Sequence, residues 1–275
     1  MERLVGVLPL AVAARVARIS VAPVKGLALV HPDEVVVGPG GVVGDRRFWL
    51  QDAEGRLVNG KTHGELLRVR AEWNEETRRL ALTFPDGESV AGVVEPGDPV
   101  EATLWKQPHP SRSVPGPWQE ALSYYAGEPL ALLWSESGAV DRGVRGGATS
   151  LVSRGSLERL REQAGAEAPV DGRRFRMLLE IDGVGAHAED GWIGQRVQVG
   201  DAVLAFVGDV GRCVVTTRNP DTGISDLDTL GTLAGYRREG RTEPLPFGVH
   251  GAVVVPGRVR VGDAVTLLER EAAVS

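Results

Sequence analysis

The stretches RVQVGDAVLAF (residues 196–206) and RVRVGDAVTLL (residues 258–268) share the pattern Val-x-Val-Gly-Asp-Ala-Val. In each, alternating valines stop at a Gly-Asp pair and resume beyond it, which is typical of a strand, a turn and a second strand. Because the pattern occurs only twice, without a regular period, it favours two similar hairpins in one barrel over a repeat solenoid. The repeated pattern predicts a β-barrel in the C-terminal half of the chain.

The first hundred residues show a similar β pattern. Residues 15–105 read as short strands separated by clusters of Gly, Pro, Asp and Asn, as in an all-β sandwich or barrel. The stretch QPHPSRSVPG (107–116) concentrates Pro and Ser and offers little to bury, so we expect a loop between two domains there. We therefore predict a mainly β protein with an N-terminal extension (1–14), an N-terminal β-barrel domain (15–116) and a second β-barrel domain (117–275).

A few covering helices are predicted among these strands. PWQEALSYYAG (117–127) begins with a proline suited to the first turn and ends at a glycine. SLERLREQAG (156–165) begins with Ser156 as the expected N-cap and also ends at a glycine. A third helix is expected in SDLDTLGTLAGYRREG (225–240), where the leucines keep helical spacing despite two glycines.

Composition and charge narrow the function. The chain has 275 residues, 36 of them Gly, and a formal net charge of -6, with a pI of about 5.5. No global positive field exists to hold a nucleic acid or an acidic membrane surface, so we expect neither partner. The apolar start (Leu4–Ala14) is too short to span a bilayer, and Glu2 weakens the signal-peptide reading. With a single cysteine, which excludes an internal disulfide, the expected location is cytoplasmic.

That cysteine, Cys213, is the first candidate site residue. It stands in GRCVVTT (211–217), where strand alternation would place it on the opposite face from Arg212. Free cysteines are most often buried in a core, so spacing alone favours a structural thiol. Arg212 and Arg218 nearby in sequence would stabilise a thiolate, the form that binds a soft metal or attacks as a nucleophile. The residues by themselves leave these roles open.

Other common site motifs are absent from the sequence. There is no CxxC, HExxH, Walker or GxSxG pattern, and the Gly-rich stretch 38–44 reads as a turn between strands. Short arginine clusters occur in GDRRF (44–48) and RRFRMLL (173–179). Surface ion pairs are the ordinary explanation for such clusters, but with Lys25 they are also suited to a local pocket for a phosphate.

Taken together, these segments resemble the MOSC family, which is named after the C-terminal domain of molybdenum-cofactor sulfurase, here preceded by the N-terminal β-barrel that often accompanies it. The resemblance covers nearly the whole chain and follows the family's segment order. The closest functional type is that of the amidoxime-reducing components, which reduce N-hydroxylated compounds with a pyranopterin molybdenum cofactor (molybdopterin). The most specific segments are VAPVKG (21–26), GDRRFWLQDAEGRLV (44–58), RFRMLLEIDG (174–183), AEDGWIGQRVQVGD (188–201), GRCVVTTRNPDTG (211–223) and PFGVHGAVVVPGRVRVGD (246–263).

The resemblance implies specific roles for residues. Cys213 matches the cysteine that binds molybdenum, which suits a thiolate ligand, and it is the implied catalytic and metal-binding residue. Lys25 and Arg46 match residues that contact the phosphate or pterin of the cofactor, and Arg176 matches a further anchor. The other positions assigned to cofactor binding by the matching motifs are Gly26, Lys61, Arg145, Arg212 and Thr216.

The chain also departs from the family pattern. Gly26 replaces a common serine, and Lys61 stands at the usual arginine. Leu178 replaces the asparagine of an Arg-Pro-Asn segment, and Arg145 stands where an acidic residue is frequent. A buried pterin edge left unpaired costs on the order of 1 to 3 kcal/mol per group, so these changes bear on cofactor retention.

The function implied by the resemblance is that of a molybdenum-dependent oxidoreductase acting on an N-oxygenated small molecule. No flavin or iron-sulfur motif is present, so electrons would arrive from a separate reductase. The substrate pocket is expected beside the loops at 145–149 and 219–223. The alternatives are a Cys213 persulfide carrier in sulfur transfer, a MOSC scaffold that has lost the cofactor and binds another anionic small molecule, and a biosynthetic enzyme for an unusual N–O or N–N compound.

Overall fold

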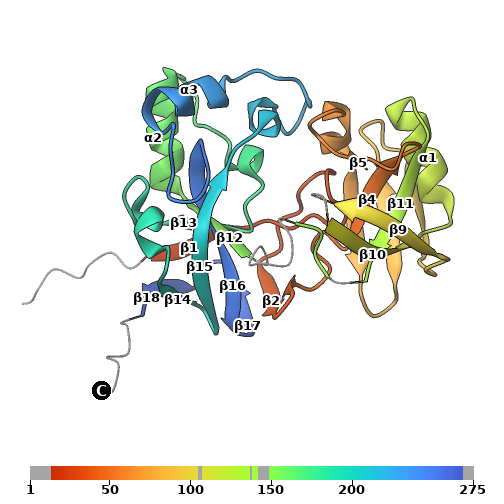
Figure 1. The fold of residues 1–275 in the computed structure, drawn as a ribbon, viewed down its shortest axis with the longest axis horizontal. Coiled ribbons are helices and arrows are strands. Elements are labelled where there is room, and N and C mark those ends of the chain that lie inside the picture. The colour runs from red at the N-terminus through yellow and green to blue at the C-terminus, as the bar shows by residue number, and fades with distance from the viewer. Residues whose placement is uncertain (1–13, 105–106, 137, 142–148, 269–275) are drawn as a thin grey trace, which may run out of the picture.

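Six strands of the C-terminal half and one strand from near the N-terminus close into a seven-stranded barrel (Figure 1). The computed structural model describes residues 14–104, 107–136, 138–141 and 149–268. Only one neighbouring pair in the barrel is parallel, and a helix makes the crossover that such a pair requires. In order around the barrel the strands are β1 (Ala14–Ile19), β13 (Leu179–Asp182), β12 (Thr149–Ser153), β16 (Pro246–Val255), β15 (Ala202–Gly211), β14 (Arg196–Val199) and β18 (Ala264–Leu267).

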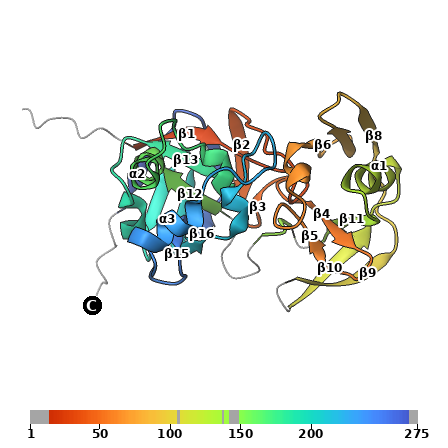
Figure 2. The ribbon, with the colours of Figure 1, turned by 90° about the horizontal axis from the view of Figure 1, so that it is seen from above.

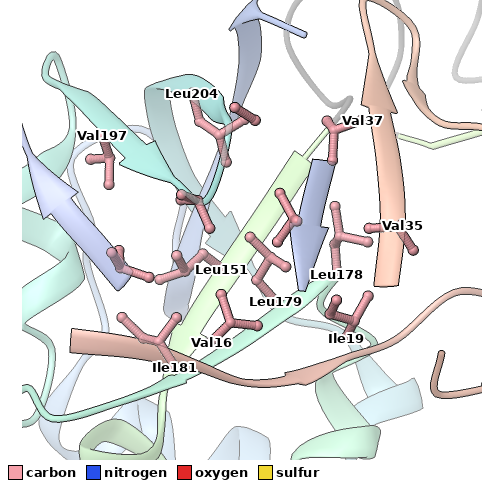
Figure 3. Close-up of a cluster of buried hydrophobic side chains, with 14 of the residues drawn as sticks. Val16, Ile19, Val35, Val37, Leu151, Leu178, Leu179, Ile181, Val197 and Leu204 are labelled. Carbon is pink, nitrogen blue, oxygen red and sulfur yellow. The ribbon is translucent and has the colours of Figure 1, made fainter. Parts of the chain in front are cut away.

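The barrel interior is filled by aliphatic side chains (Figure 3). In β14, for example, Val197 and Val199 are fully buried while Arg196 and Gln198 between them are exposed. This alternation is the period-2 pattern of a strand with one buried face. Full burial of each such side chain contributes about 1.5–3 kcal/mol relative to exposure. The barrel predicted from the sequence is therefore present, and burial of these alternating apolar side chains stabilises it.

The two stretches that share the Val-x-Val-Gly-Asp-Ala-Val pattern nevertheless adopt different structures. Residues 196–206 form the β14–β15 hairpin, as predicted. Residues 258–268 do not form a hairpin, because β17 (Gly257–Arg260) pairs with β2 (Glu34–Gly38) and β18 pairs with β14 and β1. Arg258 and Arg260 on β17 both form ion pairs with Glu34 on β2. β17 thus pairs with the distant strand β2 instead of the adjacent strand β18. β3 (Gly41–Val42) pairs with the other edge of β2 and completes a three-stranded sheet.

The N-terminal half builds two further sheets around a shared core. In Figures 1 and 2 these sheets lie beside the barrel, with β2 between them and it. Phe48, Leu80 and Trp118, from three different elements, belong to one buried cluster. The five-stranded sheet has the order β5 (Leu57–Val58), β4 (Phe48–Asp52), β11 (Leu130–Ser135), β10 (Gln107–Ser113), β9 (Pro99–Leu104), and the three-stranded sheet has the order β6 (Arg70–Asn74), β7 (Arg79–Thr83), β8 (Ser89–Val93).

The stretch expected to be a boundary loop is in fact strand β10. It pairs with β9 from Gln107 to Arg112, but with β11 only from Ser111 onward. Pro108 and Pro110 precede the part that pairs on both sides. Because they are two residues apart, both missing N–H groups lie on the same side of the strand, where the Pro110 carbonyl still accepts a hydrogen bond from the Glu136 amide at 3.1 Å. Proline is tolerated there because β10 does not yet pair with β11.

Several elements pack across the division predicted at residue 116. β1 precedes the N-terminal sheets in sequence but belongs to the C-terminal barrel. Helix α1 (Pro117–Ala126) and β11 follow residue 116, yet they complete the N-terminal unit, where Trp118 and Leu122 are buried. These pairings join segments far apart in sequence, which local composition does not encode.

The three predicted helices are present. α1 ends at Gly127 in the left-handed region. α2 (Arg154–Ala164) is capped by Ser153, whose Oγ accepts a hydrogen bond from the Ser156 amide, so the expected cap at Ser156 is one turn too late. α3 (Thr229–Tyr236) is capped by Asp228. Over the described ranges, four 3-10 turns complete the helical elements: η1 (Gly64–Arg68), η2 (Gly172–Phe175), η3 (Ala188–Trp192) and η4 (Val214–Thr217). In the part of the chain that is described, none of the helices is both long and apolar enough to cross a bilayer.

Candidate functional site

A cavity of about 220 Å³ lies between the barrel and the N-terminal unit; we call it the first cavity. Its walls come from the loop after β1, the β5–η1 loop, η2 and the turn that follows β15. The structure thus brings together residues that are more than 200 positions apart, such as Lys25 and His250. Of the site residues predicted from the sequence, those that line it are Lys25, Gly26, Arg46, Lys61, Arg176, Arg212, Cys213 and Thr216. Arg145 lies outside the described residues.

Cys213 is placed at this cavity by a break in the backbone. Strand β15 ends at Gly211 and η4 begins at Val214, so strand alternation does not continue through the cysteine, contrary to expectation. Its carbonyl accepts hydrogen bonds from the amide and the hydroxyl of Thr216, both at 3.0 Å. The Thr216 hydroxyl also pairs with that of Thr229 on α3 at 2.6 Å. Thr216 therefore holds the turn that presents the half-buried thiol.

Arg212 and Arg218 make positioning contacts. Arg212 donates from Nε to the Phe247 carbonyl and from Nη1 to the Phe175 carbonyl, both at 2.9 Å. Arg218 donates from Nη1 to the Gly223 carbonyl at 2.8 Å and from Nη2 to the Lys61 carbonyl at 3.2 Å. These contacts tie the turn around Cys213 to β16, to η2 and to the N-terminal unit. A role for either arginine in stabilising a thiolate stays a prediction.

Two of the predicted cations share one carboxylate. Lys25 Nζ lies 3.4 Å from one oxygen of Asp141, and Arg46 Nε lies 3.4 Å from the other. Arg46 is also ion-paired with the buried Asp45, which accepts a hydrogen bond from the Ala22 amide at 2.7 Å. Burial lowers the pKa of Lys25, and Asp141 opposes that shift. Desolvated cations of this kind attract an anion more strongly than solvated ones.

Arg176 adds a third cation. It ends η2 with a positive φ of 54°, and its Nη2 donates to the Leu27 carbonyl at 2.8 Å. Burial, and then the charge of Arg46, lower its pKa to about 10. Arg46 in turn donates to the Arg176 carbonyl at 2.8 Å, so the two side chains are held in one network. Three cations face two carboxylates here, which leaves the group with a positive balance.

The departures from the family pattern have structural explanations. Gly26 has a φ of +92°, and a Cβ there would lie 3.0 Å from the Asn59 Cα, so this backbone accepts glycine rather than serine. Leu178 packs among the barrel core residues (Figure 3) and is absent from the cavity lining. Lys61 is an exposed residue at the cavity edge. These three departures thus stand in different surroundings, and only Gly26 and Lys61 line the cavity.

Two loops beside this cavity approach each other closely. A Cβ on Gly64 would lie 2.2 Å from the Gly223 carbonyl oxygen and 2.3 Å from Arg218 Nη1. Gly223 itself has a φ of +74°, the left-handed region that favours glycine. The contact joins η1 of the N-terminal unit to the 219–223 loop of the barrel, which was expected to border a substrate pocket. Glycine at both positions permits this close approach.

Sequence reasoning missed several lining residues, above all Asp141. It stands in AVDRG, a stretch without a recognisable motif, and only the fold brings it to Lys25 and Arg46. Arg174 belongs to the arginine cluster noticed in the sequence, but no role was assigned to it. Within the described ranges, no group of three or more His, Cys, Asp or Glu side chains is arranged to hold a metal ion. The other missed polar residues in the lining are Asn59, Ser150 and His250.

Comparison with known proteins gives two family matches. The MOSC domain matches residues 141–266, and the MOSC N-terminal beta barrel domain matches residues 13–115. Mitochondrial amidoxime-reducing component 1 of Mus musculus is 42% identical over 125 residues, covering 43% of this chain and 36% of the mouse protein. Molybdenum cofactor sulfurase of Oryza sativa subsp. japonica is 26% identical over 237 residues, covering 73% of this chain and 28% of the rice protein.

Among solved structures, the YUAD protein from Bacillus subtilis aligns with 92% of this chain and 94% of its own, at 12% identity and a TM-score of 0.45. The chain spans about a third of the length of the curated relatives it matches.

Proposed function

Because the chain belongs to the MOSC family, with a MOSC N-terminal beta barrel domain ahead of a MOSC domain, we propose that it is a molybdenum-cofactor-dependent oxidoreductase that reduces N-oxygenated small molecules. The names of its relatives connect this family to molybdenum-related chemistry. The observation that carries the finer assignment is the first cavity, whose lining combines one thiol with six cationic side chains, among them Lys25, Arg46 and Arg176.

The donor set suits a cofactor that brings most of its own metal ligands. A single cysteine is too few to hold a metal ion alone, but it can complete the coordination of a metal already bound by other sulfur ligands. Lys25, Arg46 and Arg176 supply N–H donors for the phosphate and pterin of such a cofactor. When bound, a pyranopterin molybdenum cofactor supplies two-electron oxygen-atom transfer. The side chains at this cavity therefore fit the group implied by the family.

Each residue has a defined part in this proposal. Cys213 is the thiolate ligand, and Thr216 fixes the turn that carries it. Lys25 and Arg46 hold the phosphate. The Asp141 carboxylate, which lies between these two cations, must move away when the phosphate binds. Arg176 donates to the pterin. The close contact of Gly64 with Gly223 narrows access for water on this side of the site.

The overall reaction balances with an external electron donor. The N–O bond of an N-hydroxylated substrate breaks, two electrons and two protons are consumed, and the oxygen leaves as water. The electrons come from a separate reductase, since the chain carries no flavin or iron-sulfur motif. A cytoplasmic location is a further prediction of the same proposal.

The decisive experiment is metal analysis combined with pterin fluorescence, on protein expressed in a host that makes the cofactor. We expect near-stoichiometric molybdenum and pterin in the wild type, and loss of molybdenum in Cys213→Ser. Val214→Ala, at the neighbouring exposed position, is the matched control and should retain both. Absence of molybdenum and pterin from the wild type would refute the proposal. Sulfur uptake by metal-free wild type, lost in Cys213→Ser, would instead identify a persulfide carrier.

A further inference from the structure

A second cavity of about 200 Å³ adjoins the first. The two share Leu67, Arg174, Arg176 and Val215 in their walls, so Arg176 and Val215 separate the second cavity from the space that Cys213 lines. None of the roles derived above uses this second cavity. Its remaining lining residues are Ala28, Leu29, Arg68, Pro85, Arg173, Arg218, Pro220 and Asp221.

The lining of the second cavity is strongly cationic, although the chain as a whole is acidic. Five arginines face one carboxylate, that of Asp221. Arg173 is already neutralised, because it forms a bidentate pair with Asp221 at 2.7 and 2.8 Å and a further pair with Asp171. Arg174 is paired with Asp226 at 2.6 Å. Two of the five arginines are therefore committed to carboxylates.

The other three arginines are not neutralised in this way. Among the residues that the structure describes, Arg68, Arg176 and Arg218 have no carboxylate within ion-pairing distance. Within that part of the chain, Arg176 and Arg218 donate only to backbone carbonyls, of Leu27, Gly223 and Lys61. The Nε atoms of Arg174 and Arg218 are buried without a hydrogen-bond partner among the described residues. Unused buried donors on guanidinium groups are what an oxyanion would satisfy.

We propose that the second cavity binds an oxyanion, a carboxylate or phosphate carried by the substrate, and thereby selects anionic substrates. Arg218 and Arg68 hold the oxyanion, while the reducible end of the same molecule reaches past Val215 toward Cys213. The anion site is derived from this cavity alone, whereas the substrate assignment rests on the proposed function. A phosphate on an extended form of the cofactor has the same chemistry and is the competing source.

The anion site is tested first on metal-free protein, by calorimetric titration with inorganic phosphate and with benzoate. Arg68→Gln and Arg218→Gln should each weaken benzoate binding about tenfold relative to wild type, the loss of one charge-assisted pair. Arg68 is exposed, so its variant remains informative if Arg218→Gln fails to fold. Arg56→Gln, whose side chain is 72% exposed and lines neither cavity, is the control. Equal affinity in all four proteins would overturn the site.

The substrate assignment is tested on cofactor-loaded enzyme with two substrates, an aromatic amidoxime and its ring-carboxylate derivative. The ratio of kcat/KM for the carboxylate to that for the neutral compound should fall about tenfold in Arg68→Gln and stay constant in Arg56→Gln. An unchanged ratio, together with nucleotide released from wild type and missing from the variant, would reassign the cavity to an extended cofactor. If neither substrate is reduced by loaded wild type, the proposed function fails, and the titration still decides the anion site.

Discussion

The Nζ of Lys25 lies 3.4 Å from the carboxylate of Asp141, on a chain segment more than a hundred residues away. The other Asp141 oxygen lies 3.4 Å from Arg46 Nε. One side chain thus occupies the space between two cations that are expected to bind a phosphate. This internal counter-charge stabilises the metal-free protein, because buried cations without an anion are costly.

Asp141→Asn should strengthen phosphate binding. Removing the carboxylate takes away the counter-charge that Lys25 and Arg46 share, so affinity for inorganic phosphate should rise about fivefold, equivalent to about 1 kcal/mol for a partly exposed ion pair. Titration calorimetry measures the change. Glu136→Gln, which removes the ion pair with Arg112 in the N-terminal unit, is the control. Weaker phosphate binding in Asp141→Asn would show that Asp141 orients the two cations rather than competing with the anion.

Gly64→Ala should destabilise the contact between the two units. The new Cβ would meet the Gly223 carbonyl oxygen at 2.2 Å, a backbone atom that cannot move without shifting its loop. We expect a loss of about 1–3 kcal/mol in the free energy of unfolding, measured with urea. Gly235→Ala in α3 is the matched control, since its Cβ would meet nothing within 4 Å, and it should be neutral or slightly stabilising. Similar losses in both variants would argue against a tight loop contact.

His187 should make stability depend on pH. Burial, followed by the charges of Arg237 and Arg159, lowers its pKa from 6.5 to about 4. Both ring nitrogens are buried without a hydrogen-bond partner among the described residues. Between these two pKa values the unfolded chain binds a proton that the folded chain does not. The free energy of unfolding should therefore decrease by about 1–3 kcal/mol as the pH falls from 6.5 to 4.

The variant His187→Phe isolates this contribution, because phenylalanine keeps a ring beside Tyr236 and Phe247. Urea denaturation at pH 7 and at pH 4.5 should show a smaller loss in the variant than in the wild type. Val93→Ala, at an exposed position of the N-terminal unit, should retain the wild-type difference between the two pH values. Parallel stability curves for His187→Phe and wild type would mean that His187 is solvated in solution.

Asp228→Ala should weaken helix α3. The Asp228 carboxylate accepts a hydrogen bond from the Gly231 amide at 2.8 Å, and the helix has only eight residues, two of them glycine. Loss of the cap should cost about 1 kcal/mol, measured as a lower thermal midpoint. Asp228→Asn keeps a capping oxygen and should behave almost as wild type. If Asp228→Asn lowers the thermal midpoint as much as Asp228→Ala does, the negative charge of Asp228 rather than its hydrogen bond stabilises the helix.

The sequence was most informative where local chemistry decides the structure. The alternation in RVQVGDAV predicts the β14–β15 hairpin because a strand with one buried face needs that period. The glycines at 127 and 165 predict helix ends because they accept a left-handed backbone. Motif matching also selected residues that the fold brings to one cavity, such as Lys25, Cys213 and Arg176.

Pairing across long distances was decided by the tertiary structure. Local sequence gives a strand its tendency and its buried face, but its partner depends on which other edge is free when the chain collapses. For this reason β17 pairs with β2 rather than with the adjacent strand β18. The proline-containing segment 107–113 likewise forms a strand that pairs with β9.

The same distinction holds at the site. By itself the sequence determined a mainly β, acidic protein with one cysteine and a set of cations. Only the tertiary structure brought Asp141 between Lys25 and Arg46, turned Arg212 and Arg218 toward carbonyls, and joined a second cationic cavity to the first. The physical reason is that charges interact according to their distance in space, over a few ångströms, and the number of residues between two side chains does not determine that distance.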